Sequence, residues 1–309
     1  MSQTDTAAYL LLEDGTFFTG KSFGAKGTSG GELCFNTGMT GYQEVFTDPS
    51  YAGQVLIMNN AYIGNYGVKK DDVESDTVKI GALICKNITE RYSRMMASND
   101  LENYLIDNNI LAIHDVDTRS LVQHIRSKGA MNCIVSTEIT DKPSLQKELD
   151  KIPDMKGLNL AEKVSTKEAY TVGSDDARYK VSVLDFGVKR SMLHIMSEKD
   201  IQLKVFPATT SFDELMSFNP NGIFVSNGPG DPAAMDEAVG IIKKVLDVKK
   251  PLFGICLGHQ LLARANDIAT YKMHHGHRGL NHPVKNLKTG KSEITTQNHG
   301  FGVDIESAK

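Results

Sequence analysis

A single cysteine, Cys256, stands between two glycines where an apolar run changes to a helical pattern. Residues 251–256 have the composition of a strand that ends at the cysteine, and residues 257–266 have the spacing of a helix. Gly254 and Gly258 would permit the sharp strand-to-helix turn that exposes a nucleophile. The first N–H groups of the helix would favour a thiolate and could hold an oxyanion. The pattern predicts a nucleophilic thiol, and a buried cysteine at a strand end is the alternative.

Two further loops carry residue types that could bind a substrate beside such a thiol. Residues 225–237 follow the preceding strand and include Gly228 and Gly230, whose backbones could approach a substrate and donate N–H groups. Because the carboxyl ends of parallel strands meet at one edge of a sheet, this loop should neighbour the cysteine. The alternative is an ordinary tight turn before a helix capped by Asp231. Residues 297–301 end a strand-like stretch and add an amide, an imidazole and a glycine.

Length and composition indicate an ordinary globular protein. The chain has 309 residues, 40% of them hydrophobic, and a formal net charge of −4 with the basic residues spread along it. The length predicts two domains, and the charge pattern gives no sign of a nucleic-acid or membrane-surface patch. No apolar run approaches the length of a membrane span, and the N-terminus lacks the basic region of a signal peptide.

The other three cysteines are expected to be core residues. Cys34, Cys85 and Cys133 lie in apolar stretches and are widely spaced, with no Cys-x-x-Cys pair. Neither a zinc site nor a disulfide framework is therefore expected. Reduced thiols fit a cytoplasmic protein.

The pattern of apolar residues changes near the middle of the chain. Residues 1–150 are predicted to form a mixed, largely β domain that begins with a hairpin turning at Asp14-Gly15. Residues 151–178 are polar, contain proline and glycine, and are interpreted as a linker. Residues 179–309 alternate strands and helices, which predicts a mostly parallel, flavodoxin-like sheet with helices on both faces. The predicted fold class is therefore α/β.

The three motifs together resemble those of the class I glutamine amidotransferases. Residues 227–232, 254–260 and 297–301 occur in the order found in that family. Further segments resemble the small, glutamine-hydrolysing subunits of carbamoyl phosphate synthetases: residues 36–54, 61–67, 115–129, 183–193 and 274–284. The resemblance runs over nearly the whole chain and implies the class I amidotransferase fold for its second half. Another class I amidotransferase is the alternative, which the N-terminal half disfavours.

The resemblance implies that Cys256 attacks the side-chain amide of glutamine, giving a γ-glutamyl thioester and ammonia, after which water releases glutamate. Leu257 and a glycine of the Gly-Pro-Gly loop would bind the oxyanion. The implied substrate-binding residues are Gly228, Gly230, Leu257, Gln260, Asn298, Gly300, Phe301 and Gly38. The family often has serine at the position of Gly38, so a hydroxyl contact is missing here.

The resemblance also implies a partner. The ammonia would pass to a large synthetase subunit, in a heterodimer or a larger assembly, for carbamoyl phosphate synthesis in the arginine and pyrimidine pathways. The large subunit would use ATP and magnesium. This chain has no P-loop and no Gly-x-Gly-x-x-Gly motif, so no cofactor is expected in it.

One expected part of the catalytic machinery is missing. In the family a histidine, followed two residues later by a glutamate, serves as the base, and no His-x-Glu occurs here. We therefore expect a chain truncated at its C-terminus and a poor glutaminase, or a noncatalytic binding subunit. His259 is close in sequence to Cys256, but the helix should carry it away from the thiol. Four histidines lie near one another: His274, His275, His277 and His282. No carboxylate or cysteine joins them, so no metal site is expected.

Overall fold

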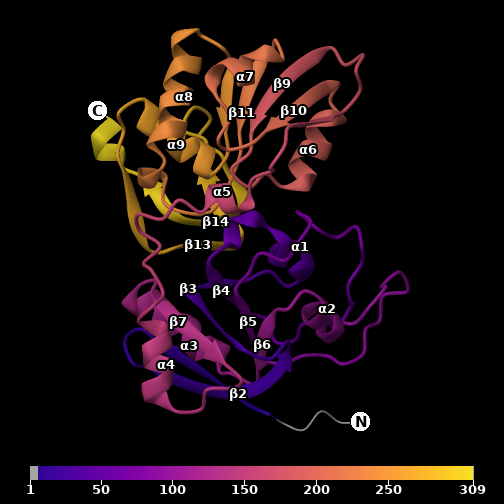
Figure 1. Cartoon of the computed structure of the whole chain (residues 1–309), viewed down its shortest axis with the longest axis vertical. Helices are drawn as coiled ribbons and strands as arrows, with labels where there is room; N and C mark the ends of the chain where they lie inside the picture. Colours follow the sequence, from indigo (N-terminus) through magenta and orange to yellow (C-terminus); the bar gives the residue numbers. More distant parts are fainter. Residues whose placement is uncertain (1–5, 309) are drawn as a thin grey trace. The chain divides into compact units, whose positions relative to one another are not determined.

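A computed structural model describes residues 6–308 (Figure 1). The chain forms two compact units, each built from segments that are distant in sequence. The first unit contains the residues up to 47, residues 53–154 and residues 274–300, and the second contains the rest. This division differs from the predicted one, because residues 274–300 cluster with the N-terminal half and residues 155–178 with the second unit.

The first unit is largely β, as predicted, and its strands close into a barrel, which was not predicted. Its strands follow the order β1-β2-β6-β5-β4-β3-β7 around the barrel. The strands are β1 (Ala7–Leu12), β2 (Phe17–Gly24), β3 (Thr28–Asn36), β4 (Gln54–Met58), β5 (Ala82–Cys85), β6 (Leu111–His114) and β7 (Asn132–Ser136). Strands β3 to β6 pair in parallel, and the remaining pairs are antiparallel. The predicted hairpin at Asp14-Gly15 is the antiparallel pair β1–β2.

The predicted core cysteines are buried in this barrel. Cys34, Cys85 and Cys133 lie on β3, β5 and β7 and are at most 2% exposed. Burial raises the pKa of the Cys85 thiol well above its ordinary value, and burial does the same for Cys133, with a smaller contribution from Cys34. Such thiols are core packing, as the sequence indicated.

Four helices complete the described part of the first unit, and an aspartate immediately precedes three of them. The helices are α1 (Tyr42–Thr47), α2 (Leu101–Asp107), α3 (Thr118–Lys128) and α4 (Lys142–Leu149). Asp100, Asp117 and Asp141 each accept a hydrogen bond from a backbone N–H in the first turn, so they cap α2, α3 and α4. Helix α3 ends at Gly129, which has φ 105°.

A long hairpin near the end of the chain was not predicted. Strands β13 (Thr270–Lys285) and β14 (Ser292–Val303) form a two-stranded sheet joined by a turn around residues 286–291. Ala130 of the first unit donates its N–H to the carbonyl of His274 at 2.6 Å. This contact is one reason why the middle of the hairpin clusters with the barrel.

The second unit contains the predicted parallel sheet. Its order is β12-β11-β9-β10-β8, with all pairs parallel except β8–β10. The strands are β8 (Tyr170–Val172), β9 (Tyr179–Leu184), β10 (Ile201–Phe206), β11 (Gly222–Val225) and β12 (Leu252–Gly254). Strand β8 and helix α5 (Ala161–Val164) lie within the segment that was interpreted as a linker, so that interpretation was incomplete.

Helices cover both faces of this sheet, as predicted (Figure 1). The main helices are α6 (Arg190–Ser197), α7 (Phe212–Ser217), α8 (Asp236–Asp247) and α9 (Leu257–Ala265). The apolar side of α6 packs on one face, and α7, α8 and α9 pack on the other. Three short 3₁₀ helices also belong to this unit: η1 (Pro49–Tyr51), η2 (Pro232–Ala234) and η3 (Ile305–Ala308).

The strand order places a binding crevice at a defined point. From β9 the chain moves to β10 on one side of the sheet, and from β11 it moves to β12 on the other side. Neighbouring strands whose connections leave in opposite directions open a crevice at their carboxyl ends. The ends of β9 and β11 are therefore the expected location of a ligand in this unit.

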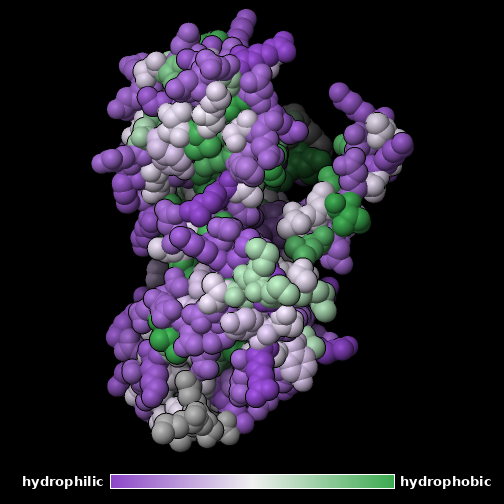
Figure 2. All heavy atoms as spheres, turned by 90° about the vertical axis from the view of Figure 1, so that its right-hand side faces the viewer, coloured by the Kyte–Doolittle hydropathy of each residue, from purple (hydrophilic) through white to green (hydrophobic). Residues whose placement is uncertain are grey.

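The visible surface is mostly hydrophilic, with apolar side chains in small groups (Figure 2). Among the exposed large apolar residues of the first unit are Tyr62, Met95 and Met96. No helix within residues 6–308 is long and apolar enough to span a membrane.

Candidate active site

Cys256 lies in a strained turn between β12 and α9. Its backbone has φ 52° and ψ −108°, a combination that residues with a Cβ rarely adopt. Unlike the three barrel cysteines, it is only partly buried. The structure therefore places the predicted nucleophile in the turn that the sequence indicated, immediately before the first residue of α9.

The two glycines around Cys256 are required by close backbone packing. A Cβ at Gly258 would overlap the carbonyl oxygen of Val225 at the end of β11, and a Cβ at Gly254 would meet the backbone of Gly258. The N–H of Gly258 lies 3.0 Å from the carbonyl oxygen of Ser226. The start of α9 is thus held directly against β11, which leaves the strain of the turn on Cys256.

Leu257 supplies a backbone N–H beside the thiol. It is the first residue of α9, so its N–H has no carbonyl partner within the helix. Its side chain is 1% exposed and packs in the core beneath α7, α8 and α9. A buried side chain fixes the direction of this N–H, which is the property that an oxyanion donor needs.

The loop after β11 is fixed against the end of β9. A Cβ at Gly228 would overlap the carbonyl oxygen of Phe186, so only glycine fits there. The side-chain amide of Asn227 donates to the carbonyl of Gly187 at 2.8 Å and to the hydroxyl of Ser50 at 3.0 Å. This loop therefore lies at the carboxyl ends of β9 and β11, where the crevice is expected.

Asp231 holds the other end of the same loop. One of its carboxylate oxygens accepts from the N–H of Gly157 at 2.9 Å, and the other accepts from the N–H of Ala233 at 2.8 Å. The second bond caps η2, so capping by Asp231 is real, although the capped helix is short. Gly230, with φ 93°, lies against the backbone of Leu158. Two interpretations of this loop are therefore compatible. Asp231 caps a helix, and the glycine backbone comes close to other groups.

Gln260 connects α9 to the end of β14. Its backbone N–H bonds to the carbonyl of Cys256 at 3.0 Å, one helical turn earlier, and the residue is 5% exposed. Its side-chain amide donates to the carbonyl of Phe301 at 2.9 Å. Phe301 packs on Met155 and Leu160. The sequence assigned Gln260 to substrate binding, and the structure shows that its amide nitrogen also fixes the backbone of Phe301.

The remaining predicted binding residues belong to the first unit. Gly38 donates its N–H to the side-chain oxygen of Asn36 at 2.6 Å. Asn298 and Gly300 lie on β14, and the side-chain oxygen of Asn298 accepts a hydrogen bond from Arg278. In the second unit, a Cβ at Gly228 would lie 3.0 Å from Leu257 Cδ2. Gln260 bonds to the carbonyl groups of Cys256 and Phe301, so the structure brings these five residues together.

The histidines show one close pair. His277 Nδ1 and His299 Nε2 lie 3.1 Å apart, and His299 Nε2 is also 3.1 Å from the side-chain oxygen of Gln297. Burial and the neighbouring cations lower the pKa of His275. His259 is exposed on α9. Within residues 6–308, no three His, Cys, Asp or Glu side chains are grouped to hold a metal ion.

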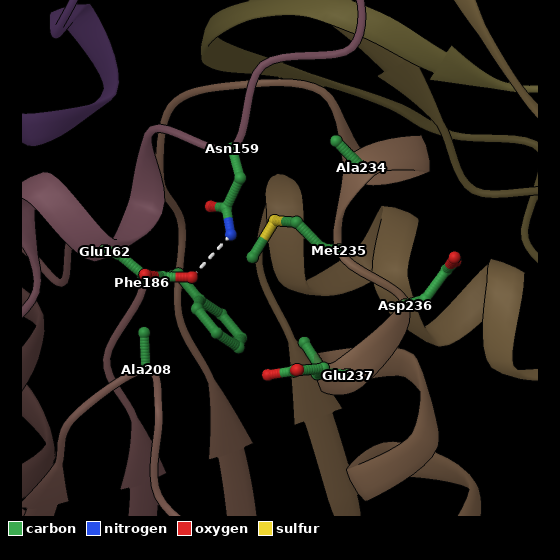
Figure 3. A pocket seen from close by; sticks show the side chains of 9 residues that line it. Asn159, Glu162, Phe186, Ala208, Ala234, Met235, Asp236 and Glu237 are labelled. Carbon is green, nitrogen blue, oxygen red and sulfur yellow. Dashed lines mark hydrogen bonds between the residues drawn. The ribbon is translucent and has the colours of Figure 1, made fainter.

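A cavity of about 310 Å³ opens at the same edge of the sheet and was not predicted. Its lining residues follow β9, β10 and β11 or come from the segment interpreted as a linker: Asn159, Glu162, Phe186, Ala208, Ala234, Met235, Asp236, Glu237 and Ala238. In Figure 3, Asn159 points toward Glu162, and its amide donates to that carboxylate at 2.8 Å. Phe186 lines the cavity with its ring and also packs its carbonyl against Gly228. The cavity therefore adjoins the loop after β11.

Comparison with known proteins decides the family. Residues 10–135 match the family described as carbamoyl-phosphate synthase small chain, CPSase domain, and residues 182–309 match glutamine amidotransferase class-I. A carbamoyl phosphate synthase small chain from Thermotoga maritima is 48% identical over 97% of this chain and 76% of that protein. The chain belongs to the carbamoyl phosphate synthase small-chain family.

Other carbamoyl phosphate synthase small chains agree. The one from Chlorobaculum tepidum is 44% identical, covering 97% of this chain and 82% of that protein, and the one from Salmonella typhimurium is 44% identical, covering 97% and 83%. Among solved structures, an aminopeptidase from Aneurinibacillus sp. strain AM-1 has 10% identity and a TM-score of 0.26 over 85% of this chain and 70% of that one, a likeness too low to bear on the fold.

Membership of the carbamoyl phosphate synthase small-chain family confirms three predictions. The predicted family, the α/β fold class and the role of glutaminase subunit agree with these matches. A small chain implies a large subunit as its partner. Membership of another class I glutamine amidotransferase family is excluded, because both the small-chain region and the amidotransferase region match.

Proposed function

We propose that this chain binds L-glutamine and that Cys256 attacks the carbon of its side-chain amide. A bond forms between Sγ and that carbon, the carbon–nitrogen bond breaks, and the nitrogen leaves as ammonia after taking a proton. Water then cleaves the thioester, which releases glutamate and restores the thiol. The observation that carries the proposal is the strained backbone of Cys256 at the N-terminus of α9.

Two backbone N–H groups would stabilise the oxyanion of the tetrahedral intermediate. Leu257 supports the first position, because its N–H is the first of α9 and its side chain is locked in the core. Gly228 or Gly230 supports the second, because the loop is fixed at both ends. A rigid pair of donors needs no rearrangement when the charge develops.

The substrate contacts follow the resemblance residue by residue. Gly228, Gly230, Gln260 and Phe301 would bind glutamine in the second unit. Asn298, Gly300 and Gly38 remain assigned to glutamine by resemblance alone. Gly38 brings no hydroxyl, so its part is limited to its backbone.

The chemistry at Cys256 also requires a general base. A thiol nucleophile usually depends on a neighbouring histidine, and no His-x-Glu occurs within these 309 residues. We therefore propose that a chain of these residues forms the glutamine pocket but turns glutamine over slowly. Full glutamate production by the isolated chain, at the rate seen with the large subunit present, would contradict this statement.

The remaining parts of the function concern the partner. The ammonia would pass to the large subunit, which uses ATP and magnesium to make carbamoyl phosphate for arginine and pyrimidine synthesis. This chain would bind neither ATP nor a metal. The reduced, buried cysteines support a cytoplasmic location.

Selective labelling tests the proposal. A chloromethyl ketone analogue of L-glutamine would alkylate Cys256, with chloride as the leaving group, and peptide mass spectrometry would locate the adduct. The three barrel cysteines are matched internal controls, since each is at most 2% exposed. Labelling of Cys256 alone, slowed by L-glutamine, is expected. Labelling that L-glutamine does not slow would favour a noncatalytic binding subunit, which the absence of a His-x-Glu also suggests.

A further inference from the structure

A buried arginine anchors the hairpin β13–β14 inside the first unit. Arg278 lies on β13 and is 5% exposed, and its counter-charge is the carboxylate of Glu32 on β3, also 5% exposed. Arg278 Nη2 lies 3.8 Å from Glu32 Oε1. A buried guanidinium is tolerated only when its charge is compensated, so this pair ties β13 to the barrel.

The barrel fixes the position of the carboxylate. Glu32 and Gln54 are directly opposite each other in the parallel pair β3–β4. The side-chain amide of Gln54 donates to Glu32 Oε1 at 3.0 Å, and Gln54 Oε1 lies 3.5 Å from Arg278 Nη1. The head group of Arg278 is therefore held by two side chains from adjacent, fully paired strands.

The same guanidinium reaches the predicted glutamine-binding strand. Arg278 Nη1 donates a hydrogen bond to the side-chain oxygen of Asn298 on β14. A guanidinium can only donate, so the oxygen of the amide must face it and the amide nitrogen must face the other way. Because a guanidinium is planar and rigid, this bond fixes both the position and the orientation of the amide.

We propose that Arg278 is a positioning residue for glutamine binding. It holds the amide of Asn298 in one orientation, and Glu32 and Gln54 hold Arg278. The inference rests on the proposed function, in which Asn298 binds glutamine. Arg278 sets the affinity for glutamine without touching the reacting atoms, so its loss affects binding more than the chemical step.

Two measurements on the full chain test the inference. The first is hydrogen exchange of the backbone amides of residues 296–300, which reports on the strand without any ligand. The second is the rate of Cys256 alkylation by the chloromethyl ketone analogue, measured against its concentration, with iodoacetamide as a reagent that needs no glutamine pocket. The variants are Arg278→Gln, Arg278→Lys and the double variant Arg278→Met with Glu32→Leu. Lys285→Gln, an exposed cation on the same strand, is the control.

We expect Arg278→Gln to speed exchange at residues 296–300 and to raise the half-saturating analogue concentration about tenfold, as for loss of a charged hydrogen bond. The limiting alkylation rate and the iodoacetamide rate should stay within about twofold of wild type, since the thiol is unchanged. Arg278→Lys should fall between Arg278→Gln and wild type, and Lys285→Gln should match wild type.

The double variant separates positioning from stability. Replacing both charges by apolar residues should preserve the melting temperature, because no uncompensated charge remains. It should still raise the half-saturating concentration, because Asn298 has lost its donor. Wild-type exchange and wild-type analogue binding in a folded Arg278→Gln or double variant would overturn the inference. Failure of the analogue to label Cys256 in the wild-type chain would instead refute the proposed function. Hydrogen exchange alone would then decide whether Arg278 positions residues 296–300.

Discussion

Replacing Gly258 by alanine tests whether the nucleophile turn depends on close backbone packing. The added Cβ would overlap the carbonyl oxygen of Val225 and would lie 2.7 Å from the carbonyl carbon of Val225 and 3.0 Å from the carbonyl oxygen of Ser226. All of these are backbone atoms of β11 and its end, so none can rotate away. The start of α9 would have to move outward by about an ångström, a shift that overpacking in a dense core resists.

The size of the effect follows from this geometry. Overpacking against backbone should lower the free energy of unfolding by about 3 kcal/mol. A displacement of about 1 Å at the thiol should also slow alkylation by the glutamine analogue about a hundredfold, because the reacting groups are no longer aligned. Gly240→Ala is the matched control, since this exposed glycine of α8 has nothing within 4 Å of a new Cβ. It should stabilise the chain by about 0.5–1 kcal/mol.

Two separate assays are made on both variants: urea unfolding, and the kinetics of Cys256 alkylation in the folded protein. Gly258→Ala should shift the unfolding midpoint downward without a change in slope, and Gly240→Ala should shift it slightly upward. If Gly258→Ala unfolds within about 0.5 kcal/mol of wild type and reacts at the same rate, the packing argument for this turn is wrong.

Three further outcomes are expected. Glu32→Gln should lower the free energy of unfolding by about 3–5 kcal/mol, because it leaves the guanidinium of Arg278 buried and uncompensated, whereas Lys285→Gln should leave thermal unfolding unchanged. The free energy of unfolding should fall as the pH rises above about 8.5, by about 1.4 kcal/mol per pH unit for each of Cys85 and Cys133, because burial raises both thiol pKa values and only the unfolded chain then releases these protons. Urea unfolding of Cys85→Ala between pH 8 and 10 should show a smaller fall of this free energy per pH unit than wild type. An equal fall in both proteins would count against burial as the cause. Cys256→Ala should abolish labelling by the glutamine analogue while melting like wild type, and residual labelling in this variant would place the reactive group elsewhere.

Local signals in the sequence predicted much of the fold. The hairpin β1–β2 was recognisable from Asp14-Gly15 between two apolar runs. The parallel sheet was recognisable because buried strands and amphipathic helices alternate with short connections. These features depend on residues close together in the chain, which is why the sequence was sufficient.

Features that depend on distant pairings were missed. Closure of the barrel needs β1 to pair with β7, and no local pattern marks that partner. The hairpin β13–β14 is largely polar and contains Pro283, so it lacks the alternation by which strands are predicted. The cavity beside Phe186 was missed because its Asn159 and Glu162 come from a segment interpreted as a linker.

The candidate site shows the same contrast. Cys256 and its glycines were found because the turn between a strand and a helix is encoded within five residues. The network of Arg278, Glu32 and Gln54 was not found, because these side chains meet only when a late strand packs on two early ones. Their residue types, a charged pair and an amide, are common on surfaces and gave no signal of burial.

Direct detection of the acyl-enzyme tests the central claim. The chain would be mixed with L-glutamine, quenched in acid and digested, and the peptide that contains Cys256 would be weighed by mass spectrometry. Because a thiolate pocket without a strong base should acylate and then hydrolyse slowly, we predict a γ-glutamyl adduct on Cys256 that hydroxylamine removes. Absence of this adduct at saturating glutamine, or its appearance on another residue, would contradict the assignment of Cys256 as the nucleophile.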